Sequence, residues 1–168
     1  MKALLLMRHA KSSWDDSMLA DFDRPLNKRG LQAARLMGDL IRKKNLKPDL
    51  VLTSSAVRAK ETTRLVCEGA ALTAPVVFEK RIYEAGAQRL FEVVSEIDER
   101  INCAMMVGHN PGFEAFLESL TGEARRLPTA ALALVELDIR EWRHVAATTG
   151  HLRWVMKPKE LASGSAKN

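Results

Sequence analysis

Two arginines and two histidines of this chain are of the residue types that act together on a phosphate group: Arg8, His9, Arg58 and His109. An arginine guanidinium presents a planar fork of N–H donors that matches the oxygens of phosphate. The neutral nitrogen of one histidine ring is a competent nucleophile toward phosphorus, and a second, protonated histidine would add a positive donor. Phosphoryl transfer mainly requires in-line positioning and charge stabilisation, so these four side chains could support it without a metal ion.

Each of these residues lies in a segment that follows a short apolar run. Residues 3–7, 50–52 and 104–107 are continuous apolar runs, which is typical of strands buried on both faces of a sheet. The first arginine–histidine pair follows the first run directly, and the segments with the second arginine and second histidine follow the other two runs. In an open parallel sheet the carboxyl ends of the strands lie on one edge, where ligands bind. We therefore expect the four side chains to meet at that edge.

Amphipathic stretches between the apolar runs predict helices. Leu31, Ala34, Met37 and Ile41 recur at helical spacing, which indicates a helix over 28–44. Further helices are expected over residues 56–68, over 88–100 and from Pro111 onward, with Asn27, Ser55 and Asn110 as N-cap residues of the first, second and last. Three more strands are expected at 76–78, 131–137 and 152–157. Strands alternating with helices predict an α/β fold, a three-layer α/β/α sandwich whose mostly parallel sheet gains an antiparallel edge from the last two strands.

The length of the chain fits one domain. It has 168 residues, of which 46% are apolar, enough for one full core but not for a second. We assign residues 1–160 to this domain. Residues 161–168 are expected to form a flexible C-terminal tail, because their composition is of low complexity.

The charge balance indicates a mild preference for anions. Lys and Arg outnumber Asp and Glu by 26 to 21, which gives a formal net charge of +5. Such an excess attracts phosphorylated molecules, although it is also compatible with an ordinary basic surface. The basic residues are scattered and no aromatic residues are interleaved with them for base stacking, so we expect no nucleic-acid partner.

The cysteine pattern and the N-terminal sequence predict a cytoplasmic protein. Cys67 and Cys103 stand alone among apolar neighbours, without metal-ligand spacing, which favours free thiols in a reducing compartment. The apolar run 3–7 is too short for a signal peptide, and no stretch approaches the length of a membrane span. The sequence also lacks a Walker loop and a carboxylate cluster for magnesium, so we expect neither a metal nor a cofactor.

Taken singly, the candidate residues also have ordinary structural explanations. His109 lies in a turn rich in Gly, Asn and Pro, and Arg58 could be a surface residue of a helix. His144 and His151 flank a predicted turn at 148–150, which favours a surface role for both. We favour an anion site over these explanations because all four residues are predicted to lie at one edge of the sheet.

The motifs, in their order along the chain, resemble those of the histidine phosphatase superfamily, which includes the phosphoglycerate mutases. Residues 7–10 resemble its Arg-His signature, residues 54–62 its second-arginine segment and residues 107–112 its second-histidine segment. The compact length and the segment 82–85 are similar to the SixA-type phosphohistidine phosphatases. The resemblance extends over roughly residues 2–157 and implies a phosphoglycerate mutase-like fold.

This resemblance implies a role for each matched residue. His9 would be the nucleophile that becomes phosphorylated, while Arg8, Arg58 and His109 would hold the phosphoryl group. The N–H groups near Asn110 would add donors at the start of a helix. Glu84 matches the acidic position that serves as proton donor in many members, although it could equally be a loop carboxylate that pairs with a neighbouring lysine or arginine.

The resemblance and the spacing together indicate a protein substrate. Only 25 positions separate Glu84 from His109, and a helix and a strand consume most of them, so no lid is available to cover the site. An open site can receive phosphohistidine displayed on another protein, such as a histidine phosphotransfer domain. We therefore expect a phosphohistidine phosphatase. The alternatives are a phosphatase of small phosphate esters, and a module that binds phosphoproteins without turnover.

Overall fold

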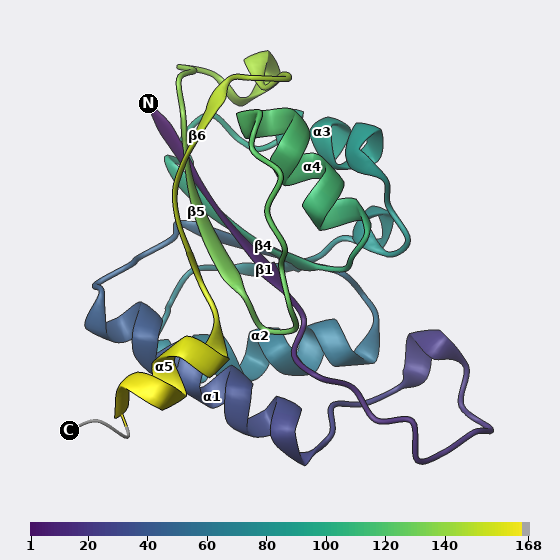
Figure 1. The fold of residues 1–168 in the computed structure, drawn as a ribbon. Coiled ribbons are helices and arrows are strands. Elements are labelled where there is room, and N and C mark those ends of the chain that lie inside the picture. Colours follow the sequence, from purple (N-terminus) through teal and green to yellow (C-terminus); the bar gives the residue numbers. More distant parts are fainter. Residues whose placement is uncertain (166–168) are drawn as a thin grey trace.

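Six strands form one sheet in the order β3-β2-β4-β1-β5-β6 in the computed structural model, which describes residues 1–165 (Figure 1). The strands are β1 (Lys2–Arg8), β2 (Leu50–Thr53), β3 (Val76–Phe78), β4 (Cys103–Gly108), β5 (Leu132–Leu137) and β6 (Gly150–Met156). The pairs β1–β4, β2–β4 and β2–β3 are parallel, whereas β5 runs antiparallel to both β1 and β6. The predicted α/β fold with a mostly parallel sheet and an antiparallel edge is confirmed.

Helices cover both faces of this sheet, which makes three layers (Figure 1). The helices are α1 (Lys28–Lys43), α2 (Val57–Ala70), α3 (Ala87–Ser95), α4 (Gly112–Thr121) and α5 (Pro158–Ser165). Helices α3 and α4 lie on one face, and α1, α2 and α5 lie on the other. Because β1, β2 and β4 are parallel, their carboxyl ends lie at the same edge of the sheet, where the loops that follow them begin.

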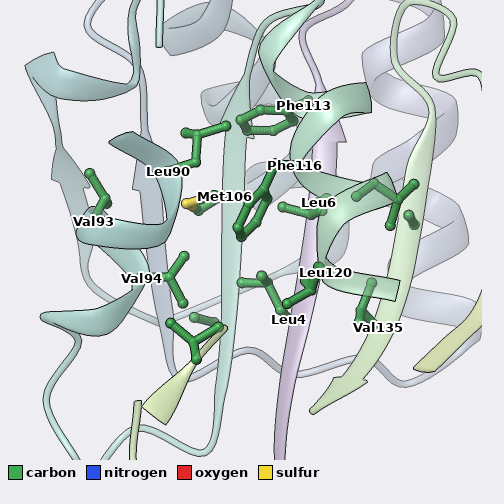
Figure 2. Close-up of a cluster of buried hydrophobic side chains, with 14 of the residues drawn as sticks. Leu4, Leu6, Leu90, Val93, Val94, Met106, Phe113, Phe116, Leu120 and Val135 are labelled. Atoms are coloured by element: carbon green, nitrogen blue, oxygen red, sulfur yellow. The ribbon is translucent and has the colours of Figure 1, made fainter. Parts of the chain in front are cut away.

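Alternation along β1 divides the apolar residues between two cores. Leu4 and Leu6 point to the side of α3 and α4, whereas Leu5 and Met7 point to the side of α1 and α2, and all four are fully buried. Figure 2 shows the first core, in which the phenyl ring of Phe116 lies against the sheet. Burial on both faces explains why β1 is a continuous apolar run.

Two helix boundaries differ from the sequence prediction. Helix α3 ends at Ser95 rather than near residue 100, because the chain turns at Asp98, whose carboxylate accepts the N–H of Arg100 at 2.8 Å. Ile97 still packs into the core, and its spacing from Leu90 and Val94 is the one expected of a longer helix. Ser55 does not cap α2, since Ala56 occupies the N-cap position without a side-chain hydrogen bond.

Asn27 caps α1 as predicted. Its side-chain oxygen accepts the N–H of Gly30 at 2.8 Å, which satisfies one of the free donors at the start of the helix. Gly30 in turn lies against the backbone of Lys11, two residues after His9. The first turn of α1 therefore supports the loop that follows β1.

The C-terminal segment is helical up to Ser165. Helix α5 crosses the boundary that we predicted after residue 160. The remaining residues of the expected flexible tail, 166–168, lie outside the part of the chain that the structure describes. None of the helices within residues 1–165 is long and apolar enough to cross a membrane.

Replacing Gly30 with alanine is expected to destabilise the protein. The added Cβ would lie 2.1 Å from the carbonyl oxygen of Lys11. To relieve this overlap, Gly30 or Lys11 would have to move, although both are bonded to the helix cap Asn27. We expect urea denaturation to show a free energy of unfolding lower by about 1–3 kcal/mol. Gly69→Ala is the matched control, because its Cβ would make ordinary contacts of 3.4 Å or more inside α2. Equal stability of the two variants would contradict the assigned contact.

Candidate active site

Backbone hydrogen bonds join the ends of β1, β2 and β4 at one edge of the sheet. The N–H of His9 donates to the carbonyl of Gly108 at 3.0 Å, and the N–H of Ser54 donates to the carbonyl of Val107 at 3.0 Å. The segments that follow these three strands therefore start side by side. This arrangement brings His9, Arg58 and His109 together as the sequence predicted.

His9 is buried with a defined ring orientation. Its Nδ1 lies 2.7 Å from the carbonyl oxygen of Ala10, and only 6% of the residue is exposed. A carbonyl oxygen can only accept, so Nδ1 carries the proton and donates it. The neutral ring then has its lone pair on Nε2. This Nε2 accepts a long hydrogen bond of 3.4 Å from Nε of Arg58.

His109 lies beside His9, with ring centroids 5.1 Å apart. Its Nε2 is 2.7 Å from the hydroxyl of Ser54, which also accepts the N–H of Ala56 at 3.2 Å. Its Nδ1 is buried and has no hydrogen-bond partner. The second histidine thus keeps one ring nitrogen uncommitted within the protein.

Arg58 enters the site from the first turn of α2 and is almost fully buried. Besides its contact with His9, the guanidinium donates to Asp21 twice: to the main-chain oxygen at 2.6 Å and to the carboxylate at 2.9 Å. The ion pair offsets the cost of burying a cation. It also fixes the plane of the guanidinium, because two of its nitrogens are held by one residue.

Asp21 is the residue of this site that sequence reasoning missed. Its carboxylate accepts from Arg58, from the hydroxyl of Tyr83 at 2.7 Å and from Nε of Arg24 at 3.2 Å. It lies in a short 3-10 turn within an irregular loop, so no periodic pattern marked it. Its position three residues before Arg24 was the only available signal, and Asp23, which directly precedes Arg24, was an equally good candidate.

Arg8 stands at the end of β1 and is half-buried. One terminal nitrogen donates to the carbonyl of Leu127 at 3.2 Å, while Nε is buried without a partner. Within the described residues, the buried side-chain atoms that lack a hydrogen-bond partner are Arg8 Nε, His109 Nδ1 and Asn110 Oδ1. Arg8 Nε and, when it carries the ring proton, His109 Nδ1 can donate to a phosphate oxygen, whereas Asn110 Oδ1 can only accept. Unpaired buried groups are costly, and they are retained where a ligand can satisfy them.

Asn110 is not the helix cap that we predicted, and the predicted phosphate donors near it would be main-chain N–H groups. Its side-chain N–H groups donate to Glu114 at 2.8 Å and to the carbonyl of Leu127 at 2.9 Å, so no side-chain donor is left for a phosphate. Nor does it cap α4, since Pro111 occupies the N-cap position after a cis peptide bond. The asparagine instead ties the start of α4 to the segment that contacts Arg8.

A cavity of about 500 Å³ opens beside these residues. Its walls include Arg58, Tyr83, Glu84, His109 and the start of α4. Arg8 and His9 lie next to this cavity rather than in its wall, a difference from the prediction that all four candidates would line it. His9 reaches the site through its contacts with Arg58 and His109.

Glu84 is exposed on the cavity wall. Its backbone is in the left-handed region with φ of 57°, which is uncommon for a residue other than glycine and is often found at functional positions. Arg81, the arginine with which Glu84 could have paired, is bound to Glu79 and Glu96 instead. The structure therefore places this carboxylate where it can face a ligand.

The remaining candidates lie outside the site. His144 and His151 are exposed, in agreement with the expected surface role. Cys67 and Cys103 are free thiols, and burial raises the pKa of both, to about 11 for Cys103. Within the described residues, no group of three or more His, Cys, Asp or Glu side chains is arranged to hold a metal ion.

Comparison with known proteins identifies the family. The sequence profile of the histidine phosphatase superfamily (branch 1) matches residues 4–126. The chain belongs to this superfamily. An uncharacterised chloroplastic protein of Arabidopsis thaliana is 31% identical over 166 residues, covering 93% of this chain and 76% of that protein.

Solved structures of other histidine phosphatases share the fold. A candidate phosphohistidine phosphatase, SixA from Agrobacterium tumefaciens, has a TM-score of 0.81 and 29% identity, with 94% of this chain and 98% of that chain covered. The protein histidine phosphatase SixA in complex with tungstate has a TM-score of 0.78 and 23% identity, covering 95% and 99%. The SixA-type resemblance predicted from the motifs is confirmed.

Electrostatics keep both histidines of this superfamily member neutral. Burial lowers the pKa of His9 to about 4, and the nearby Arg58 and Arg8 add to the effect. Burial, the His9 ring and Arg58 lower the pKa of His109 to about 3. The Tyr83 hydroxyl and Arg58 hold the pKa of Asp21 below its usual value, so this carboxylate stays charged. The site therefore combines neutral rings with arginine cations.

We expect the rings of His9 and His109 to stay neutral well below the pKa of about 6.5 of a free histidine. A lowered pKa means that a proton binds only when the pH falls further, so neither ring should protonate until the pH approaches about 4. Nitrogen-detected NMR between pH 8 and 5 should show no protonation of either ring and the Nδ1–H tautomer for His9. Signals of exposed His144 and His151 provide the comparison. Protonation of His9 near pH 6.5 would contradict its burial.

Proposed function

We propose that this chain is a metal-independent phosphatase that hydrolyses phosphohistidine on a protein through phosphorylation of His9. The observation that carries the proposal is the orientation of His9. Its Nδ1–H is held by the Ala10 carbonyl, so the lone pair of Nε2 faces Arg58 and lies next to the His109 ring. A buried, neutral and oriented imidazole among cationic donors is suited to attack phosphorus.

In the first step, Nε2 of His9 forms a bond to phosphorus while the bond from phosphorus to the substrate nitrogen breaks. The phosphorylated substrate ring leaves as neutral histidine when its other nitrogen is protonated, so it needs no further proton from the enzyme. In the second step, water attacks the phosphorus on His9 and the bond to Nε2 breaks. Inorganic phosphate leaves and the neutral ring is restored, which balances charge and protons over the cycle.

The unpaired donors around His9 would stabilise the transferring group. Arg8 has an uncommitted Nε, and the guanidinium of Arg58 already contacts the attacking nitrogen. With Ser54 donating its hydroxyl proton to Nε2 of His109, that neutral ring carries its own proton on Nδ1, the atom without a protein partner. Three preorganised donors then face the phosphoryl oxygens in both steps.

Accessibility supports a protein substrate. The span between Glu84 and His109 is occupied by α3 and β4, and Glu84 is exposed at the cavity wall. A phosphorylated side chain displayed on another protein can therefore reach the site. Mutase chemistry gains from excluding water, which an open site does poorly. A histidine phosphotransfer domain in the cytoplasm would be such a partner.

The alternative substrate class is small phosphate esters. An alcohol leaves as a strong base and benefits from a general acid, and Glu84 on the cavity wall could donate that proton. A module that only binds phosphoproteins is less well supported, because capture of phosphate requires no nucleophile. The two enzymatic functions therefore differ in how much their turnover depends on Glu84.

Replacing His9 with alanine should abolish turnover while the protein remains folded. Wild-type enzyme quenched rapidly with labelled substrate should carry acid-labile, base-stable phosphate, and the variant should carry none. Arg58→Ala should lower the rate by roughly a hundredfold or more, because it removes a donor from both transition states. A folded His9→Ala protein with near-normal turnover would exclude the proposed nucleophile.

A substrate panel separates the two enzymatic functions. We expect a phosphohistidine-bearing protein to have a higher kcat/KM than small phosphate esters, with no loss of turnover in a metal chelator. Glu84→Gln should change phosphohistidine turnover little, because its leaving group needs no general acid. Higher kcat/KM for an ester, together with its loss in Glu84→Gln, would favour the ester phosphatase. Loss in chelator with recovery by a divalent ion would contradict metal independence.

A further inference from the structure

The loop between β1 and α1 exposes a group of large apolar side chains. Trp14 is 76% exposed, Met18 90%, Leu19 39% and Phe22 36%. We call these four residues the apolar loop. Within the described residues, the other exposed large apolar side chains are Met1 and the three residues of edge strand β3. Clustering of four such side chains within nine positions is typical of an interaction surface.

The apolar loop adjoins the catalytic cavity. The ring of Phe22 packs edge-on against Tyr83 with centroids 5.1 Å apart, and Tyr83 packs edge-on against His109 at 5.4 Å. Asp21, the preceding residue, binds Arg58 inside the site. Any protein that presents a phosphorylated side chain to this cavity must therefore pass close to the loop.

The base of the loop is fixed and its tip projects. Ser13 donates its N–H to the Pro25 carbonyl at 2.8 Å, and Arg24 places its guanidinium 3.4 Å from the centre of the Trp14 ring. Arg24 also pairs with Asp21 at 3.2 Å. Figure 1 shows the loop extending away from the body of the domain, beyond the start of α1. A tryptophan held in place loses little conformational freedom when a partner covers it.

We propose that the apolar loop is the docking surface for the protein that carries the phosphohistidine, and that it binds an apolar patch beside the phosphorylated side chain. This inference rests on the proposed function. None of the four apolar side chains lines the cavity, so a free phosphorylated amino acid bound there would not need them, whereas a protein substrate would cover them. The loop would then contribute to selection of a protein over a small molecule.

The test compares two substrates in one variant. Met18→Ser combined with Leu19→Ser removes two exposed apolar groups and keeps Asp21, Phe22 and Arg24. We expect kcat/KM for a phosphohistidine-bearing protein to fall at least about tenfold, as for loss of well-buried interface side chains, while kcat/KM for free phosphohistidine is unchanged. Val76→Ser, which removes a 41% exposed apolar side chain from the amino end of β3, should change neither value.

Three results would overturn the docking role. They are an unchanged kcat/KM for the protein substrate, an equal loss for both substrates, and a shift of the variant from dimer to monomer in sedimentation, which would assign the loop to contact with a second copy. Failure of the proposed function is distinct, because it shows in the wild-type protein as no turnover of either phosphohistidine substrate. In that case the docking role falls with it.

Discussion

The parallel pairing of β1 with β4 sets the position of the whole site. Arg8 pairs with Gly108 at the last step of this ladder, so the next residue of each strand is a histidine. The bond from the His9 N–H to the Gly108 carbonyl then holds the two rings in contact. Successive side chains of a strand point to opposite faces, so a slip of one residue would move Leu4 and Leu6 out of their core as well as separate the histidines. Core packing and site geometry therefore enforce the same register.

Positive charge is concentrated in the buried site, and the carboxylate of Asp21 compensates part of it. Asp21 accepts from Arg58, Arg24 and Tyr83, and it remains charged because these donors lower its pKa. Burial lowers the pKa of Arg8, which has no comparable partner. Neutral histidines avoid further repulsion between cations. The resulting excess of unpaired donors is unfavourable for the free protein, and phosphoryl oxygens would relieve it.

Substrate choice depends on how the surroundings of the site are built. The same short connection that leaves no room for a lid places α3 and β4 directly between Glu84 and His109. The loop after β1 contributes Asp21 to the cavity wall, while other parts of it extend away from the domain (Figure 1). A cavity beside a projecting apolar loop is the arrangement on which the proposed protein substrate rests. Phosphohistidine also suits a site in which the acidic group is exposed, because its leaving group needs little acid catalysis.

Strand positions, most helices and the meeting of three candidate residues followed from local patterns. Apolar runs and helical spacing reflect burial that each element needs wherever it lies, and strand ends of a parallel sheet share an edge by geometry. The end of α3, the caps of α2 and α4, and the side-chain bonds of Asn110 did not follow, because they depend on hydrogen bonds formed with neighbouring segments. Asp21 joined the site for the same reason. Its partners lie 3, 37 and 62 positions away, and only folding brings such distant donors to one carboxylate.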